Sequence, residues 1–594
     1  MQIKRIGFVL CILVLFGIFV TINSAGKAVA QTVSDRENFV VTPPAFPLKL
    51  SSDPNARYLV DQNNQPFFIV GEAAWSLIGQ VSLEDAQLYL DDLAARGFNT
   101  VIVTLVEGYY ADNAPANFYN VQPYIPANNF SSPNEVYFAH ADAVLNYAAS
   151  KGILVILAPN YLGCCSDGWR NVLERQNTIQ DAINYGTFVG NRYRDYPNLL
   201  YTWGDDMNPD NTNVRDKIAA MANAVKAADP NHLHTFHGGP EYSSLDIKNI
   251  FGYNWLDLNS VYTYLPVQGE MINNYDPDGN LNTAPPMPLF LFESHYETDW
   301  DNRDALTTRR EGYVAVLTGA SGYAYGNNPI WHMNGHPFWN PTDWHLHLTD
   351  EGRTDMTHFM ALFNSRDWVS LVPDLNDTLV TANKGSGEDY SAAAITADGN
   401  TAIIYFPSAK TLQVSLDKIN GAQARVWWFN PQDGSAQDAG TLPTAGIQAF
   451  TPPSNQDWLL VLDNADLNLP APGSSLQLTA TPSATATNGP SATPTPTMTP
   501  SPTATATSLA SATPTNTPPP SNTPTPTKTP KKTATPTSLP ATSTPTSQPA
   551  SPTPTVILTA TATATPKRST PTPTPTGGIP TATPLPTATA RPPR

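Results

Sequence analysis

The hydrophobic pattern of residues 66–370 alternates between short apolar runs and longer stretches with apolar positions at helical spacing. The short runs are rich in β-branched and aromatic side chains, which is typical of buried strands. One helical stretch opens at Ser82 with a Ser-x-x-acid capping box. The predicted strands cover 66–70, 100–106, 153–158, 199–203, 232–236, 260–264, 289–292 and 323–326. The predicted helices cover 82–97, 134–152, 179–194, 213–228, 304–319 and 354–363.

Eight strands separated mainly by helices within this span predict an α/β fold, a (β/α)8 TIM barrel over residues 66–375. A doubly wound sheet is the alternative, and it would carry a glycine-rich phosphate loop after the first strand. The sequence there is Gly71-Glu72-Ala73-Ala74-Trp75, which is no such loop. Residues 31–65 then form a lead-in with short strands.

Residues 384–463 change to period-two apolar patterns without helical spacing, which predicts a small antiparallel β-sandwich. The expected strands are 392–396, 402–406, 412–416, 424–429 and 458–462. Turn sequences such as Asn430-Pro431-Gln432-Asp433-Gly434 separate them. Because neighbouring side chains point to opposite faces, Trp427 and Trp428 should divide between the sandwich core and a second surface.

The two ends of the chain differ in composition from the part between them. Residues 1–30 resemble a secretory signal: Lys4 and Arg5, an apolar run of about 15 residues, and the cleavage pattern Ala28-Val29-Ala30. An uncleaved membrane anchor is the alternative, but the run is short for a spanning helix. Residues 471–594 contain 29 of the 58 prolines and no acidic or aromatic residue, so we expect a disordered Thr/Pro-rich spacer. The protein is therefore predicted to be secreted, with a tail that could be glycosylated or associate with a cell surface.

The charge balance limits the possible partners. Residues 31–470 hold 22 Lys+Arg against 50 Asp+Glu, a net charge of −28. Such a field repels phosphate backbones, so we expect no nucleic-acid binding. Three cysteines exclude a disulfide scaffold and a structural zinc site. Cys164 and Cys165 are expected in the loop after the third strand, either bonded to each other or as free thiols. No metal and no cofactor are predicted, and we expect a monomer.

Two predicted strands end in carboxylates. In a barrel the working residues project from the C-terminal ends of the strands. The fourth strand leads into Gly204-Asp205-Asp206-Met207-Asn208-Pro209, and the seventh leads into Glu293-Ser294-His295-Tyr296-Glu297. Cleavage of a glycosidic bond needs such a pair, because one carboxyl group protonates the leaving oxygen while the other attacks the sugar or activates water.

These segments, with Gly71-Glu72-Ala73-Ala74-Trp75, Thr235-Phe236-His237 and Tyr325-Gly326-Asn327-Asn328-Pro329-Ile330-Trp331, resemble the apiosidase-like glycoside hydrolases. The resemblance covers residues 48–463. It implies a retaining barrel enzyme followed by a sandwich that is named a collagen-binding domain. The segment Val426-Trp427-Trp428-Phe429-Asn430-Pro431 resembles the signature of that domain.

The resemblance implies that Asp206 is the acid/base and Glu293 the nucleophile. The family usually has Gly-Gly-Asp where this chain has Gly204-Asp205-Asp206, so either aspartate could be the acid; alignment through Asn208-Pro209 favours Asp206. Side-chain alternation along a strand would then turn Asp205 away from the pocket. For a retaining enzyme the two carboxyl groups should be about 5–5.5 Å apart.

Further side chains near the strand ends are expected to contact the substrate or support the site. Either Tyr262 or Tyr264 should hydrogen-bond to Glu293, and we expect only one of them to point inward. Glu72 stands where the family usually has Asp. The complete set of predicted substrate-binding residues is Glu72, Trp75, Asp205, His237, Tyr262, Tyr296 and Trp331.

Three functions compete at this stage. A secreted glycoside hydrolase acting on plant or microbial polysaccharide fits both carboxylates. A non-catalytic carbohydrate-binding barrel would need one carboxylate to be disabled. A protease or collagen-handling protein is suggested only by the name of the sandwich, and the chain has neither a His-Glu-x-x-His helix nor a Gly-x-Ser-x-Gly elbow.

Overall fold

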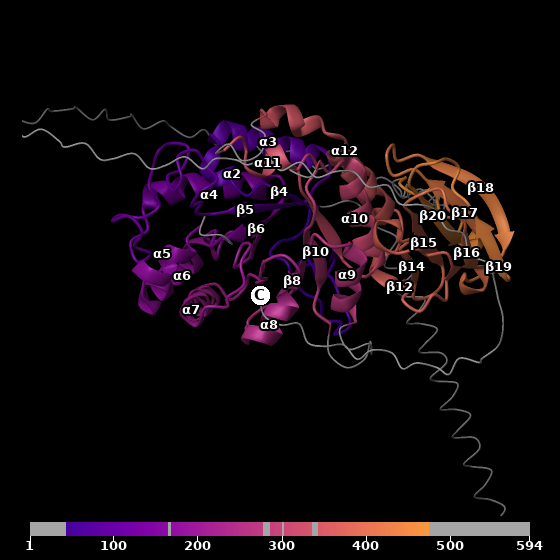
Figure 1. The fold of residues 1–594 in the computed structure, drawn as a ribbon, viewed down its shortest axis with the longest axis horizontal. Coiled ribbons are helices and arrows are strands. Elements are labelled where there is room, and N and C mark those ends of the chain that lie inside the picture. Colours follow the sequence, from indigo (N-terminus) through magenta and orange to yellow (C-terminus); the bar gives the residue numbers. More distant parts are fainter. Residues whose placement is uncertain (1–42, 164–167, 277–285, 300–301, 336–341, 475–594) are drawn as a thin grey trace, which may run out of the picture. The chain divides into compact units, whose positions relative to one another are not determined.

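The computed structural model describes residues 43–163, 168–276, 286–299, 302–335 and 342–474 (Figure 1). The predicted signal sequence, most of the Thr/Pro-rich tail and the Cys164-Cys165 pair lie outside these ranges. Within them, no helix is both long enough and apolar enough to cross a membrane.

The N-terminal half is the predicted barrel (Figure 1). The described sheet has the order β7-β6-β5-β4-β11-β10-β9-β8, and all neighbouring strands from β7 to β9 pair in parallel. Its strands are β4 (Ile69–Ala73), β5 (Thr100–Thr104), β6 (Leu154–Ala158), β7 (Leu199–Tyr201), β8 (Tyr242–Ser243), β9 (Asn259–Tyr262), β10 (Leu289–Glu293) and β11 (Gly322–Tyr325).

The predicted first strand is in fact two strands. Pro66–Phe67 forms β3 of a small antiparallel sheet with β1 (Lys49–Leu50) and β2 (Leu59–Val60). The barrel strand β4 begins at Ile69 and continues beyond the predicted end to Ala73.

The predicted fifth strand, residues 232–236, is not a regular strand, although it fills the fifth position of the barrel. Tyr201 of β7 forms a parallel bridge with His234. Serine hydroxyls make the bonds on its other side: Ser244 Oγ accepts from the Phe236 N–H at 3.0 Å, and Ser260 Oγ donates to the Phe236 carbonyl at 2.8 Å. Side chains therefore replace part of the backbone ladder that the apolar pattern predicted.

Helices follow the strands and cover the outside of the barrel (Figure 1). They are α2 (Leu77–Gln80), α3 (Leu83–Ala95), α4 (Glu135–Ser150), α5 (Arg170–Gln176), α6 (Ile179–Tyr193), α7 (Thr212–Ala228), α8 (Ser244–Phe251), α9 (Val267–Tyr275), α10 (Ala305–Leu317), α11 (Asn328–Trp331) and α12 (Glu351–Asn364). The predicted cap at Ser82 is present, because its side chain accepts from the Asp85 N–H at 3.1 Å. The strands separate two apolar layers: Ile69 packs into the barrel interior and Val70 into the layer beneath the helices.

The C-terminal part is the predicted sandwich, built from a six-stranded and a three-stranded sheet. The first has the order β12-β14-β15-β20-β17-β18, and the second the order β13-β16-β19. The strands are β12 (Leu371–Pro373), β13 (Val380–Ala382), β14 (Ala393–Thr396), β15 (Thr401–Phe406), β16 (Leu412–Ser415), β17 (Gln423–Phe429), β18 (Ala436–Pro443), β19 (Ile447–Phe450) and β20 (Trp458–Asn464).

The central strands of the larger sheet of the sandwich are buried on both faces. Trp428 belongs to the apolar core between the two sheets. Trp427, on the opposite face of β17, belongs to the same cluster as the helix layer of the barrel. The other sandwich residues of that cluster are Ala392, Ala394, Ile403, Tyr405, Phe429, Leu459 and Val461. The sandwich is therefore packed against the barrel by a continuous apolar surface.

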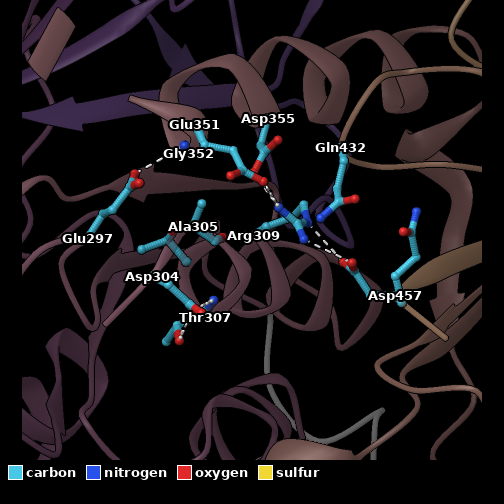
Figure 2. Close-up of polar contacts among 12 residues, drawn as sticks. Glu297, Asp304, Ala305, Thr307, Arg309, Glu351, Gly352, Asp355, Gln432 and Asp457 are labelled. Carbon is cyan, nitrogen blue, oxygen red and sulfur yellow. Dashed lines mark hydrogen bonds and ion pairs between the residues drawn. The ribbon is translucent and has the colours of Figure 1, made fainter. Parts of the chain in front are cut away.

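A buried guanidinium joins the two parts (Figure 2). Arg309 of α10 has a fully buried side chain, and its Nε and Nη2 atoms each lie 2.9 Å from the carboxylate of Asp457, next to β20. Its Nη1 lies 2.5 Å from Asp355 of α12. The Tyr405 hydroxyl also donates to Asp457 at 3.0 Å. Since removing one partner leaves a buried charge uncompensated, this contact should be costly to break.

We expect Asp457→Ala to lower the free energy of unfolding by about 3–5 kcal/mol, because Arg309 would stay buried without its main partner. Chemical denaturation followed by tryptophan fluorescence measures the loss. Asp438→Ala is the matched control, because the Asp438–Arg425 pair in the same sandwich is partly exposed and screened by solvent, so its loss should be much the smaller of the two. Equal losses for the two variants would contradict a buried clamp.

Candidate active site

The C-terminal ends of the barrel strands surround a cavity of about 190 Å³. The described residues that line it are Trp75, Glu107, Tyr110, Tyr161, Asp206, His237, Tyr262, Tyr264, Glu293, Tyr296, Asp299, Asn328 and Trp331. They come from loops and strand ends all around the barrel, and most are carboxylates or aromatic rings. This composition suits a polyhydroxylated ring, which presents both hydroxyl groups and apolar faces.

Glu293 is the last residue of β10, and its side chain is only 10% exposed. One carboxylate oxygen, Oε2, lies 3.1 Å from Nε2 of His237. The other, Oε1, accepts a hydrogen bond of 3.3 Å from the Tyr264 hydroxyl. The carboxylate is thus contacted from two sides.

His237 connects the two predicted catalytic residues. Its Nδ1 accepts a hydrogen bond of 3.2 Å from the Asp206 backbone N–H. A neutral imidazole that accepts at Nδ1 carries its proton on Nε2, which is the atom that faces Glu293. The ring is held in place by stacking on Trp75, at 5.3 Å between centroids, and on Phe292, at 4.7 Å.

The segment that carries the aspartates is a left-handed bend, not a strand. β7 ends at Tyr201, and Gly204, Asp205 and Asp206 have φ angles of 91°, 51° and 65°. A Cβ atom on Gly204 would lie 2.3 Å from the Phe236 ring, so only glycine fits there. Two consecutive non-glycine residues with positive φ are costly, at roughly 1–3 kcal/mol each, and such strain is concentrated at functional sites.

The bend separates the two aspartates. Asp206 lines the cavity, whereas Asp205 is fully buried and does not. The predicted substrate contact of Asp205 is therefore wrong, and the reason given for its orientation is wrong too, because strand alternation does not apply in a bend. Burial raises the pKa of Asp205 well above its usual range, and nearby Glu107 and Glu293 raise it further. Of the two aspartates, Asp206 is therefore the one placed to contact a ligand in the cavity.

Four of the other predicted residues lie at the cavity. The Trp75 indole donates to the Tyr296 hydroxyl at 3.1 Å, which fixes two aromatic walls relative to each other. Trp331, in α11, is half-buried and donates to Asn328 Oδ1 at 3.0 Å. Tyr262 packs against His237 with ring centroids 4.7 Å apart.

Both tyrosines of the pair Tyr262 and Tyr264 line the cavity, although only one was expected to point inward. Residues two apart share one face of a strand, so the expectation of opposite directions was wrong. Tyr264, just beyond the end of β9, is the one that donates to Glu293.

The predicted substrate contact of Glu72 is also wrong. Its carboxylate is fully buried on β4 and forms a two-pronged ion pair with Arg353 of α12, at 2.8 and 2.7 Å. The Tyr89 hydroxyl donates to it at 2.9 Å. Glu72 therefore belongs to a buried ion pair that connects β4 of the barrel to α12.

The sequence argument missed several residues of the cavity: Glu107, Tyr110, Tyr161, Asp299 and Asn328. Glu107 lies just after β5, so the strand-end rule that selected Glu293 would have found it. Asn328 begins α11, and the other three lie in loops whose path the sequence does not reveal. The described residues contain no group of three His, Cys, Asp or Glu side chains arranged to hold a metal ion.

Barrel enzymes that break glycosidic bonds set their carboxylates at this end of the strands, facing a pocket for the sugar. Fold and site together define a glycosidase. The chain belongs to the apiosidase-like family, because the family model described as "Apiosidase-like, catalytic domain" matches residues 53–370, more than half of its length. A second model, "Putative collagen-binding domain of a collagenase", matches residues 372–463. The resemblance drawn from the sequence is confirmed.

Solved structures share the fold. A glycoside hydrolase family 5 protein from Bacteroides vulgatus superimposes with a TM-score of 0.61 and is 24% identical, over 70% of this chain and 94% of that one. A further structure, described as a glycoside hydrolase, has a TM-score of 0.62 and 24% identity, over 71% of this chain and 97% of the other. Among curated proteins, none matches the chain.

Proposed function

We propose that the protein is a secreted, retaining glycoside hydrolase that acts on plant or microbial polysaccharide, with Glu293 as nucleophile and Asp206 as acid/base. The observation that carries the proposal is the placement of both carboxylates on one cavity, with the Glu293 carboxylate fixed by His237 and Tyr264. Secretion is supported by the signal-like first 30 residues of the sequence.

In the first step Glu293 would attack the anomeric carbon while Asp206 gives its proton to the leaving oxygen. A glycosyl ester on Glu293 and a free alcohol result. In the second step Asp206, now a carboxylate, would take a proton from water as that water attacks the same carbon, which releases the sugar and restores both groups. Two displacements at one carbon retain its configuration.

His237 supports this cycle by placing its Nε2 atom 3.1 Å from the Glu293 carboxylate, which limits how that carboxylate can move. The same ring fixes the backbone of Asp206. One imidazole therefore holds the nucleophile and the bend that carries the acid in a defined relation. The aromatic walls exclude water and offer apolar faces to the sugar ring.

A non-catalytic sugar-binding barrel is the second candidate. It would require a disabled carboxylate, yet Asp206 and Glu293 both reach the cavity. The name of the sandwich model suggests collagen binding, but the larger sheet of the sandwich is covered by the barrel on one face, which favours a packing role.

The test is a screen of pectic, arabinan and xylan oligosaccharides, followed by proton NMR of the first product formed. A newly released sugar with the anomeric configuration of the substrate supports the retaining mechanism. Initial release of the opposite anomer would contradict it, and binding without any hydrolysis would favour the non-catalytic barrel.

Tyr264→Phe is expected to lower kcat about tenfold with little change in KM, because it removes one hydrogen bond to a charged nucleophile. Steady-state kinetics on the best substrate of the screen measures it. Tyr242→Phe is the matched control, since Tyr242 lies nearby on β8 but not on the cavity, and it should keep wild-type kinetics. A higher KM with an unchanged kcat would mean that Tyr264 binds substrate instead of orienting Glu293.

A further inference from the structure

We propose that Glu107 is a third functional carboxylate of this cavity: it binds hydroxyl groups of the sugar that is cleaved off and makes the site specific for an uncharged sugar. The proposal rests on the proposed glycosidase function and deepens it, because the two-carboxylate mechanism leaves Glu107 without a role.

Glu107 is oriented by its own loop. Its residue is 1% exposed, yet it lines the cavity just after β5. One oxygen, Oε1, accepts three backbone hydrogen bonds, from Gly108 at 2.8 Å, Tyr109 at 2.9 Å and Tyr110 at 3.2 Å. Burial raises the pKa of Glu107, and the three N–H groups oppose that rise by favouring the carboxylate. These bonds fix the plane of the group.

The second oxygen, Oε2, is much less occupied. Within the described part of the chain, its hydrogen bond comes from the Ser76 hydroxyl at a long 3.3 Å. A carboxylate oxygen can accept two hydrogen bonds, so Oε2 keeps capacity for a donor from the cavity. A sugar hydroxyl is such a donor, and a hydrogen bond to a carboxylate is stronger than one to a neutral acceptor.

The packing around Glu107 is built for a fixed side chain. Gly79 of α2 faces it, and a Cβ atom at position 79 would lie only 2.9 Å from the Glu107 Cβ. Glycine within a helix costs about 0.5–1 kcal/mol relative to alanine. Here it allows the helix to approach the base of the Glu107 side chain closely.

The charges of the cavity select its ligand. Glu107, Asp206 and Glu293 all line it, and no lysine or arginine is among the described residues that do. A sugar acid in the same space would add another negative group without a partner, which is strongly unfavourable at low dielectric. A neutral ring instead supplies the hydroxyl donors that Glu107 lacks. The small volume also suits one sugar ring better than a chain, since pockets for drug-sized ligands span about 300–1,000 Å³.

The experiment uses Glu107→Gln, which keeps the size of the side chain and removes its charge. On 4-nitrophenyl glycosides of neutral pentoses and hexoses, kcat/KM should fall about 10- to 100-fold, the loss of a hydrogen bond to a charged group. Glu84→Gln is the matched control, because Glu84 is exposed on α3 away from the cavity, and it should match wild type. The wild type should not hydrolyse 4-nitrophenyl uronides.

A second measurement separates contact from structure. Monodeoxy derivatives of the released sugar serve as competitive inhibitors. In the wild type, one of the monodeoxy sugars should bind about 10- to 100-fold more weakly than the parent sugar. In Glu107→Gln the difference in affinity between these two sugars should shrink to a few-fold. A purely structural role would weaken all derivatives equally. If Glu107→Gln does not fold, Gly79→Ala replaces it, because the added methyl group displaces the carboxylate without removing it. This variant should also reduce the difference in affinity between the parent sugar and the sensitive deoxy sugar.

The proposal fails if an active wild type keeps its kcat/KM in Glu107→Gln, if the deoxy profile is the same in both proteins, or if a uronide is the best substrate. In these cases the proposed function still stands. A wild type that hydrolyses no glycoside would overturn the proposed function and this proposal with it.

Discussion

Replacing Glu293 by glutamine is expected to lower kcat by roughly four to six orders of magnitude on every glycoside, activated or not. The amide cannot form the ester intermediate, and neither His237 nor Tyr264 can supply a nucleophile in its place. Initial rates on 4-nitrophenyl glycosides and on the natural oligosaccharide measure the loss. Because Gln keeps the shape of the side chain, the melting temperature should stay near that of the wild type.

A modest loss would contradict this assignment. If Glu293→Gln kept more than about one hundredth of kcat on an activated glycoside, the nucleophile would have to be another carboxylate of the cavity, with Glu107 or Asp299 the alternatives. Azide added to Glu293→Ala offers an independent check, since a small anion can enter the space left by the shortened side chain and form a glycosyl azide of inverted configuration.

Asp206→Asn is expected to act unequally on different leaving groups. Aryl glycosides with a good leaving group need little protonation, so the first step should be almost unaffected, whereas unactivated oligosaccharides should react about 10²–10⁴-fold more slowly. The measurement is kcat/KM across a series of aryl glycosides of rising leaving-group pKa. The slope of that series should become much steeper in the variant.

Asp205→Asn is the adjacent control. Asp205 is fully buried, its pKa is raised well above the usual range by that burial, and it does not reach the cavity. Because Asp205 does not line the cavity, its replacement should affect kcat/KM less than Asp206→Asn does. If kcat/KM depended more steeply on leaving-group pKa in Asp205→Asn than in Asp206→Asn, Asp205 would be the acid and the assignment of Asp206 would be wrong.

Most of the fold could be predicted because buried strands carry their own signature. The runs that became β5, β6 and β10 are mostly apolar, and every residue of these three strands is buried. Among the strands that were missed, β13, β18 and β19 carry mainly exposed residues and no apolar alternation. Residues 232–236 have the composition of a strand, but serine hydroxyls from elsewhere in the chain take over bonds that a regular ladder would make.

The site was most predictable where side chains lie at the C-terminal ends of the barrel strands. Glu293 and His237 reach the cavity for this reason. Glu72 also lies on a barrel strand, but its partner Arg353 is 281 residues away in the sequence, so nothing local indicates an ion pair. The left-handed bend at Asp205 and Asp206 is equally hidden, because it depends on the Phe236 ring that faces Gly204. The catalytic roles of Asp206 and Glu293 stay predictions until variants are measured.

The most direct test of the central claim is to trap the covalent intermediate. The reagent is a 2-deoxy-2-fluoro glycoside of the sugar identified in the screen, with a good leaving group. The fluorine slows both steps and the leaving group speeds up only the first, so the ester on the nucleophile should accumulate. Mass spectrometry of the proteolytic digest then locates the label. The account predicts one sugar per protein molecule, attached to Glu293. A label on any other residue, or complete turnover with inverted product and no label, would contradict it.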